Sequence, residues 1–357
     1  MNLLISQVVP RSLINELRVS QAANNFCWDL IDNHCFSKNI SMVPINVPKK
    51  INNENNDDVK YLQVRFFWHK SIFKYINALI ENIIVVFHAF KSKGIWYYNI
   101  TSYNMLSFIL LRYLFRKKIY VIVADFSPPT RKISLQQLVS FYIENSSGVI
   151  LLSARSNFKH KNMEVIPGII PINKITKLPN VVRKKGNRHF LFSGVLNLVT
   201  GFPMVLQVFK SLPDVDLFIS GNIDNDYAHL LIDKYPNIHY CGLLSYKDYL
   251  EMLKTTDICL SFRDPSLPEN NNNFPSKILE YFSWGKPVIS TIEYPELKGL
   301  NYITVQFEEK SLIAVIKQVH QMKNSELAAY MNNFNDLEQL VSEKIWKKAI
   351  NKIETYL

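Results

Sequence analysis

The sequence predicts an α/β protein of two domains, each built on a parallel sheet with helices on both faces. Short apolar runs of strand length alternate with longer amphipathic segments along most of the chain, which is the pattern of such a sheet. The alternation stops between Pro167 and Asn187 and then starts again. The length of 357 residues suits two domains, and a hydrophobic content of 48% is enough for two cores.

In the first half of the chain, apolar runs alternate with segments of helical periodicity. The predicted strands are Asn2–Ser6, Ser41–Asn46, Ile95–Ile100, Ile119–Ala124 and Gly148–Ser153. The predicted helices are Arg18–Phe36, Ser71–Ala89, Tyr103–Phe115 and Ser134–Asn145. Residues 94–111 carry no charge, but polar side chains such as Asn99 and Asn104 argue against a membrane span.

The segment PGIIPINKITKLPNVVRKKGN holds three prolines and a basic cluster, and we interpret it as an interdomain linker. The predicted strands after it are His189–Ser193, Asp216–Gly221, Ile238–Gly242, Asp257–Phe262 and Pro287–Thr291. The predicted helices are Phe202–Leu212, Tyr227–Tyr235, Tyr246–Thr255, Pro275–Trp284, and segments from Lys310 to a last helix, Leu337–Tyr356. The run Asn270–Asn273 is expected in a loop. The predicted domains are residues 1–180 and 181–335, followed by a C-terminal helix over 336–357.

Cysteine usage and the first residues indicate a cytoplasmic protein. The four cysteines, Cys27, Cys35, Cys241 and Cys259, show no CxxC spacing, which argues against a disulfide framework or a structural zinc site. The opening residues lack a basic region followed by an apolar stretch, so we expect no signal peptide.

The positive charge is concentrated in residues 60–132. This stretch has twelve Lys/Arg and two acidic residues, so it carries +10 of the total net charge of +11. It is also rich in aromatic residues, among them Trp68, Trp96 and Phe115. Basic residues among aromatics suit an anionic membrane surface. Nucleic acid, or a plain basic surface over an ordinary core, are the alternatives.

Several predicted strands of the second half end in glycine. Ser193-Gly194 is followed by Gly201 and a helix, and the segments DLFISGN and NIHYCGLL end in the same way. Glycine lets backbone N–H groups approach an anion, although GxGxxG is not present and each glycine alone also fits a tight turn. Together they suit a ligand along the carboxyl edge of one sheet.

The segment Asp257–Thr291 carries the most chemistry. A helix begins at Pro275-Ser276-Lys277, where the exposed N–H groups, the Ser276 hydroxyl and the Lys277 ammonium can hold a diphosphate. Glu280 lies one turn further, where its carboxylate can accept two ribose hydroxyls. An ordinary surface Lys–Glu pair is the alternative.

This segment resembles the donor-binding region of GT-B glycosyltransferases, especially the retaining group 1 class of bacterial surface polysaccharide and O-antigen synthesis. The run P-S-K-x-x-E-Y-x-x-x-G-K-P-V-I is present as Pro275 to Ile289, and Phe192–Leu196 with Gly201 resembles the opening of the C-terminal domain of these enzymes. The resemblance covers residues 188–295 and extends weakly to the N-terminal half. It implies two Rossmann-like domains facing across a cleft, with the C-terminal helix packing on the first.

The resemblance implies a donor site in the second domain and no metal, since no DxD triplet is present. Lys277, Ser276 and Arg263 would neutralise the diphosphate, Glu280 would hold the ribose, and the backbone near Leu243 would meet the base. The implied donor-binding residues are Gly194, Asn197, Gly221, Asn222, Leu243, Arg263, Asn273, Phe274, Pro275, Ser276, Lys277 and Glu280.

Three departures from the family pattern stand out. Asn272 occupies the position of a Glu that many relatives place eight residues before the ribose Glu. Thr200 replaces a basic residue just before Gly201, and the glycine-rich loop after the first strand is missing. Arg263 or Lys277 could compensate, or the donor contact could differ.

The acceptor side rests on fewer residues. Asp125, at the end of a predicted strand, could orient or deprotonate an acceptor hydroxyl, or could only cap a turn. Ser20 and Asn24 are further acceptor-binding candidates. The predicted function is transfer of a sugar from a nucleoside diphosphate, UDP for preference, to a lipid-linked saccharide at the cytoplasmic membrane. The alternatives are a non-catalytic partner subunit, and an epimerase or phosphorylase of the same fold.

Overall fold

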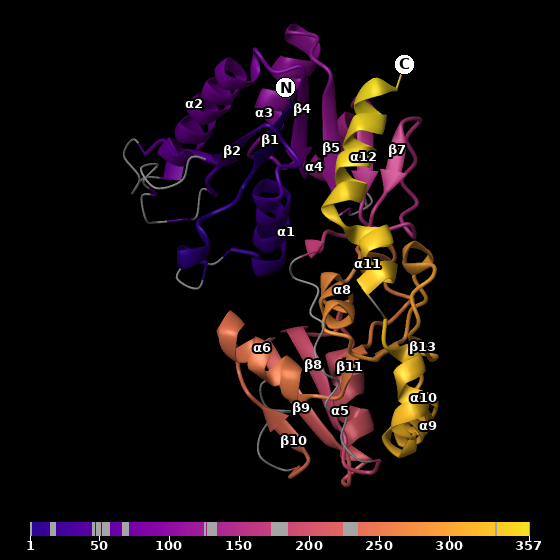
Figure 1. The fold of residues 1–357 in the computed structure, drawn as a ribbon. Helices are drawn as coiled ribbons and strands as arrows, with labels where there is room; N and C mark the ends of the chain where they lie inside the picture. Colours follow the sequence, from indigo (N-terminus) through magenta and orange to yellow (C-terminus); the bar gives the residue numbers. More distant parts are fainter. Residues whose placement is uncertain are drawn as a thin grey trace. The chain divides into compact units, whose positions relative to one another are not determined.

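The computed structural model describes residues 2–14, 19–44, 47, 51, 58–65, 71–124, 126, 134–172, 185–223, 235–332 and 334–356. The chain divides into two compact units (Figure 1): unit 1 holds Met1–Pro171 and Glu343–Leu357, and unit 2 holds Ile172–Ser342. Each unit contains one parallel sheet with helices. The predicted α/β fold with two such domains is therefore confirmed. The first unit ends at Pro171, nine residues before the predicted boundary at 180.

The sheet of unit 1 has seven strands in the order β3-β2-β1-β4-β5-β6-β7, and all of their pairings are parallel. The strands are β1 (Asn2–Ser6), β2 (Lys38–Met42), β3 (Lys60–Leu62), β4 (Gly94–Tyr98), β5 (Ile119–Val123), β6 (Gly148–Leu151) and β7 (Met163–Val165). The two edge strands, β3 and β7, were not predicted, because three residues are too few to show a period.

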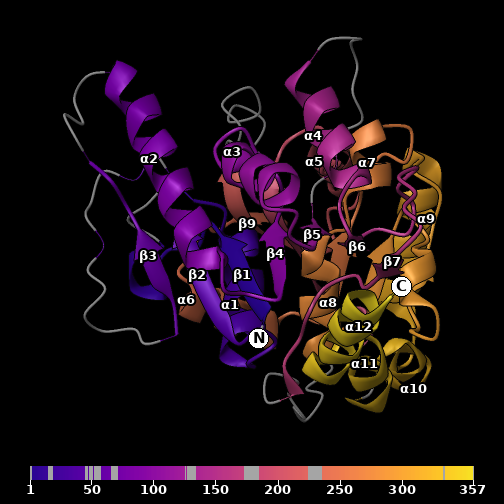
Figure 2. The ribbon, with the colours of Figure 1, turned by 90° about the horizontal axis from the view of Figure 1, so that it is seen from above.

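Helices cover both faces of this sheet. They are α1 (Gln21–Asp32), α2 (Ser71–Ala89), α3 (Met105–Ile109), which continues as a wider π turn over Leu110–Leu114, and α4 (Leu135–Glu144). Figure 2 shows α2, α3 and α4 on one side of the sheet and α12 (Glu343–Thr355) on the other. The aromatic rings of Trp96, Tyr97 and Phe108 are fully buried. Several of the rings that suggested a membrane surface therefore form the core.

The C-terminal helix α12 packs on unit 1, as the resemblance implied. The indole N–H of Trp346 donates to the Gly168 carbonyl (2.7 Å), and the Asn162 amide donates to the Ile353 carbonyl (2.9 Å). Trp96 donates to the Glu354 carboxylate (2.8 Å). The predicted single helix Leu337–Tyr356 is wrong, because the helix is interrupted at Ser342, which separates α11 (Phe334–Val341) from α12. The break coincides with the change of unit, which a continuous apolar stripe does not reveal.

The sheet of unit 2 has six parallel strands in the order β10-β9-β8-β11-β12-β13. They are β8 (His189–Leu196), β9 (Asp216–Ile223), β10 (Ile238–Tyr240), β11 (Ile258–Ser261), β12 (Val288–Ser290) and β13 (Ile303–Thr304). The helices are α5 (Phe202–Lys210), α6 (Tyr246–Thr255), α7 (Pro268–Asn272), α8 (Ser276–Ser283), α9 (Glu309–Gln321), α10 (Asn324–Leu327) and α11. The expected helix Tyr227–Tyr235 lies almost entirely outside the described residues.

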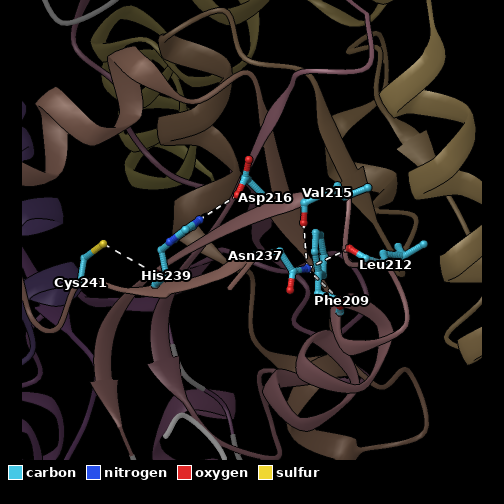
Figure 3. Close-up of polar contacts among 7 residues, drawn as sticks. All are labelled: Phe209, Leu212, Val215, Asp216, Asn237, His239 and Cys241. Carbon is cyan, nitrogen blue, oxygen red and sulfur yellow. Dashed lines mark hydrogen bonds and ion pairs between the residues drawn. The ribbon is translucent and has the colours of Figure 1, made fainter. Parts of the chain in front are cut away.

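The apolar faces of α5 and α9 pack on one face of this sheet, where Phe190, Leu217 and Leu260 are buried. The side-chain amide of Asn237 holds the end of α5 (Figure 3). It donates to the carbonyls of Phe209 (3.0 Å), Leu212 (2.8 Å) and Val215 (3.1 Å). Beside it, the His239 ring lies 2.8 Å from the Asp216 carboxylate, which links β10 to β9.

Replacing Asn237 by alanine is expected to lower the free energy of unfolding of unit 2 by about 3 kcal/mol, because buried carbonyls would lose their donor. The control is Asn145→Ala, which removes one exposed bond to the Phe141 carbonyl and is expected to cost no more than about 0.5 kcal/mol. Urea unfolding checks both values. Equal small losses would show that the three carbonyls do not depend on this amide.

Candidate active site

The strand order of unit 2 predicts a ligand site at the carboxyl ends of β8 and β11. These neighbouring strands are the point where the connections change direction, since β9 and β10 lie on one side and β12 and β13 on the other. Ligands of open α/β sheets bind in the crevice at such a point. The segments after β8 and β11 carry most of the predicted donor-binding residues.

The loop between β8 and α5 is closed by its own side chains. The Thr200 amide donates to Asn197 Oδ1 (3.1 Å), and the Asn197 amide donates to the Thr200 hydroxyl (3.2 Å). Gly201 has φ +70°, and a Cβ there would lie 2.6 Å from the Phe262 carbonyl oxygen. Thr200 therefore has a structural role at a position where a basic residue was expected.

The predicted glycine turn after β8 is instead part of the strand. β8 continues to Leu196 and β9 to Ile223, with Gly194 opposite Gly221. A Cβ on Gly221 would lie 1.7 Å from the Gly194 carbonyl oxygen. The two glycines allow the strand backbones to approach each other at the carboxyl edge.

Arg263 follows β11 and is held by neighbours on both sides. Its guanidinium donates to Asn270 Oδ1 (3.0 Å), and its backbone N–H donates to the Thr291 hydroxyl (2.7 Å). Asn270 is fully buried and also donates to the Val199 carbonyl (2.9 Å) in the loop after β8. The side chain of Asn270 therefore joins the two segments of the site.

The expected loop over Asn270–Asn273 is partly wrong, because Pro268–Asn272 form the short helix α7. Pro at the first helical position followed by Glu269 is a helix-start signal that could have revealed it.

A three-residue cluster lies in the first two turns of α8. Lys277 Nζ is 2.8 Å from Glu280 Oε2, and the Tyr249 hydroxyl of α6 donates to the same oxygen (3.0 Å). Lys277 Nζ also lies 3.8 Å from the centroid of the Tyr249 ring. Burial and the Glu280 charge raise the pKa of Tyr249, so its hydroxyl remains a donor. Among the described residues, Glu280 Oε1 has no hydrogen-bond partner, so it can accept from a ligand.

Tyr249 was missed from the sequence because it lies 31 residues before Glu280 on another helix. Tyr249→Phe is expected to weaken UDP binding about tenfold, since one hydrogen bond to a charged group is lost while the ring remains. Isothermal titration with UDP measures the change. Tyr281→Phe is the control, because that buried hydroxyl contacts Ser193 (2.8 Å) and not Glu280. Equal affinities of the two variants would contradict a positioning role for Tyr249.

The residues just before α8 are engaged in the fold. Asn272 is buried and its amide donates to the Pro268 carbonyl (2.9 Å). The Asn273 backbone N–H donates to the Glu269 carbonyl (3.2 Å), and the Phe274 ring packs edge-on against Tyr294 at 5.3 Å. Pro275 precedes the first helical residue, Ser276, whose side chain is exposed. The donor roles of these residues stay predictions.

The predicted base contact lies beyond β10, at the edge of the sheet. The Gly221 amide donates to the Gly242 carbonyl (3.0 Å), which joins the ends of β9 and β10. Asn222 and Leu243 on either side of this bond have exposed side chains, and that of Leu243 is 59% exposed. Their side chains are accessible to a ligand at this edge.

In unit 1 the acceptor candidates have structural roles. Asn24 is buried and bonds Val9 with both side-chain atoms, accepting from its N–H (2.8 Å) and donating to its carbonyl (3.1 Å). Ser20 caps α1 by accepting from the Ala23 N–H (3.3 Å). Their acceptor roles stay predictions, and Asp125 lies outside the described residues.

One carboxylate in unit 1 was not singled out from the sequence. Glu81 of α2 is buried at the carboxyl end of β3, where it accepts from the Val64 N–H (2.6 Å) and from the Tyr103 hydroxyl. Burial raises the pKa of Glu81. The sequence signal that could have revealed it is that Glu81 is the one acidic residue in the apolar segment Ser71–Ala89.

Comparison with known proteins agrees with this architecture. The family described as glycosyl transferases group 1 matches residues 174–332, which lie within unit 2. No curated protein sequence matches the chain.

Solved structures resemble the whole chain, at identities that establish the fold alone. HepE of Anabaena, solved with UDP and glucose, is 15% identical with a TM-score of 0.67, over 99% of both chains. Sucrose-phosphate synthase of Thermosynechococcus elongatus is 12% identical with a TM-score of 0.71, over 99% of this chain and 98% of its own. The apo lipopolysaccharide outer core galactosyltransferase WaaB is 14% identical with a TM-score of 0.62, over 99% of both chains.

The chain therefore has the GT-B fold, and its second unit carries the group 1 glycosyltransferase domain. The match over residues 174–332 identifies unit 2 as the domain of a glycosyltransferase, an enzyme that transfers sugars.

Proposed function

We propose that this enzyme transfers a sugar from a UDP-sugar to a lipid-linked saccharide at the cytoplasmic membrane, in bacterial surface polysaccharide assembly. The observation that carries the proposal is the Lys277–Glu280–Tyr249 cluster near the carboxyl edge of the unit 2 sheet. A cation, a helix start and a carboxylate with one unengaged oxygen suit a diphosphate joined to a ribose. UDP is the preferred nucleotide, since HepE was solved with UDP.

In this proposal, charge neutralisation supplies most of the rate acceleration. The leaving group is a nucleoside diphosphate, whose developing charge the Lys277 ammonium and the first N–H groups of α8 would stabilise. Lys277 forms an ion pair with Glu280. Its ammonium would turn from this carboxylate toward the diphosphate when a nucleotide sugar binds. The reaction proceeds with retention of configuration and without a metal ion, Arg263 adding the second positive charge.

Thermal unfolding with UDP-, GDP- and dTDP-sugars tests the donor, because a ligand stabilises the folded state in proportion to RT ln(1 + [L]/Kd). A UDP-sugar is expected to raise the Tm more than the other two. Release of UDP on adding a lipid-linked saccharide, measured on the purified chain, tests the reaction. Protection by none of the nucleotides would overturn the donor assignment.

Asn272 favours one second candidate, a non-catalytic subunit that partners another transferase. Its amide is engaged with the backbone of α7 rather than presenting a carboxylate. Donor turnover by the purified chain alone would exclude this candidate. Donor binding without turnover, restored by Asn272→Glu, would favour it.

A further inference from the structure

The outer surface of the α2–α3–α4 layer of unit 1 is apolar where a helical layer is normally polar. Among the described residues, eighteen large hydrophobic side chains are exposed, and twelve of them lie on this layer. We call them the apolar face: Tyr75, Ile76, Leu79, Ile83, Phe87, Phe90, Tyr113, Leu114, Phe115, Leu135, Leu138 and Phe141. A soluble monomer rarely exposes apolar side chains in such a concentration without a binding function.

Helix α2 contributes five of these twelve side chains, more than any other helix, and is apolar on two sides. Val85, Val86 and Ala89 pack toward the sheet, whereas Leu79 and Phe87 point outward and are 47% and 76% exposed. A helix that is apolar all round belongs in a core or against a lipid phase. No helix among the described residues is long and apolar enough to span a bilayer.

Ring contacts make the face continuous across the layer. The ring centroids of Phe90 and Phe115 are 5.4 Å apart, which joins the end of α2 to the end of the π turn. Tyr113 contacts Tyr142 at 6.2 Å, and Tyr142 contacts Phe141 at 5.5 Å, which extends the face to α4. Figure 2 shows the three helices on the same side of the sheet.

The charges beside the face are mainly positive. Two loops precede the neighbouring strands β4 and β5, and they hold five basic residues, Lys91, Lys93, Arg116, Lys117 and Lys118. Lys117 Nζ lies 4.8 Å from the centroid of the Phe90 ring. Of the acidic residues on α2, α3 and α4, Glu81 is buried and Glu144, at the end of α4, is exposed. The apolar face therefore has a cationic rim.

We infer that the apolar face docks on an anionic lipid bilayer, with the five basic residues against its headgroups. Aromatic and aliphatic side chains beside lysines are the composition of an interfacial surface. A second copy of the chain fits less well, because a two-fold interface would bring like charges together. Nucleic acid fits less well too, because Leu79, Ile83 and Leu138 offer no ring for a base to stack on.

This inference rests on the proposed function, since a lipid-linked acceptor is reached from the membrane surface. Helix α2 begins after the carboxyl end of β3, so Tyr75 and Ile76 lie toward the carboxyl edge of the unit 1 sheet. Gln7 and Thr101 meet at that edge, 3.4 Å apart, after the neighbouring strands β1 and β4. Docking through α2 would therefore bring the edge where an acceptor is expected close to the lipid.

Flotation of the full chain with phosphatidylcholine vesicles, with and without phosphatidylglycerol, tests the inference. The wild type is expected to bind vesicles that contain phosphatidylglycerol more tightly than vesicles without it. Leu79→Gln with Phe87→Gln should lower the partition coefficient about tenfold per side chain. Lys91→Gln with Lys118→Gln should lower it about 30-fold, and only on the anionic vesicles.

The matched control is Tyr356→Gln with Lys348→Gln, which changes an exposed aromatic and an exposed lysine outside the face and should bind like wild type. Wild-type binding by the Leu79/Phe87 variant would overturn the inference. A dimer without vesicles that this variant converts to a monomer would also overturn it, in favour of a second copy. Donor binding is measured separately, so vesicle binding without UDP-sugar binding would refute the proposed function alone.

Discussion

Glu280→Ala is expected to weaken UDP-sugar binding by about 100- to 10,000-fold while the protein stays folded. The carboxylate has one oxygen held by Lys277 and Tyr249 and the other without a partner among the described residues. Two hydrogen bonds from ribose hydroxyls to a charged group, at about 1.5–3 kcal/mol each, account for that loss. Lys277→Ala is expected to act in the same direction through the diphosphate. Isothermal titration with UDP and UDP-sugars measures both.

The control for this prediction is a second Lys–Glu pair on a neighbouring helix. Lys254 and Glu251 of α6 also pair at a spacing of three residues but are exposed, so Glu251→Ala removes a similar contact without touching the site. It should bind UDP like wild type. If Glu280→Ala and Lys277→Ala also bind like wild type, their pair is an ordinary surface contact and the donor site lies elsewhere.

Gly221→Ala is expected to lower the free energy of unfolding of unit 2 by about 2–6 kcal/mol. Gly221 has φ +151°, a conformation that costs other residues about 1–3 kcal/mol. Its new Cβ would also lie 1.7 Å from the Gly194 carbonyl oxygen, and such overpacking costs about 1–3 kcal/mol more. Because the two glycines lie near the carboxyl ends of β8 and β9, donor binding should weaken as well.

Gly194→Ala separates the two causes. Gly194 has φ +140°, but a Cβ there meets nothing within 4 Å, so only the conformational cost of about 1–3 kcal/mol is expected. Urea unfolding of both variants, with the transition of each unit fitted separately, measures the difference. Equal losses for the two variants would refute the close approach of the strand backbones.

Long elements with a clear period were predicted closely from the sequence. The bounds of β1, α2 and α6 are those expected, because buried strands and amphipathic helices of these lengths carry their own pattern. The edge strands β3, β7 and β13 and the helix α7 were not predicted, because segments of two to five residues are too short to show a hydrophobic period. The interruption at Ser342 was not predicted, because α11 and α12 each bury an apolar stripe and together they have the pattern of one helix.

Within the site, the sequence predicted what lies close along the chain. The Lys277–Glu280 contact follows from helical spacing, and the structure shows it at 2.8 Å. The contribution of Tyr249 and the junction made by Asn270 depend on which loops the sheet order brings together. No local pattern encodes those neighbours.

The sequence alone determined the α/β class, the two sheets and the transferase domain of the second unit, because strand–helix alternation and the Pro275–Ile289 run are local in the chain. Only the tertiary structure decided which aromatic rings are exposed. Trp96 was counted among the aromatic residues of the basic region and is buried, whereas Leu135 and Phe141, outside that region, join the apolar face. The physical reason is that a side chain's exposure depends on which face of the sheet or helix it occupies, and packing against distant segments sets that.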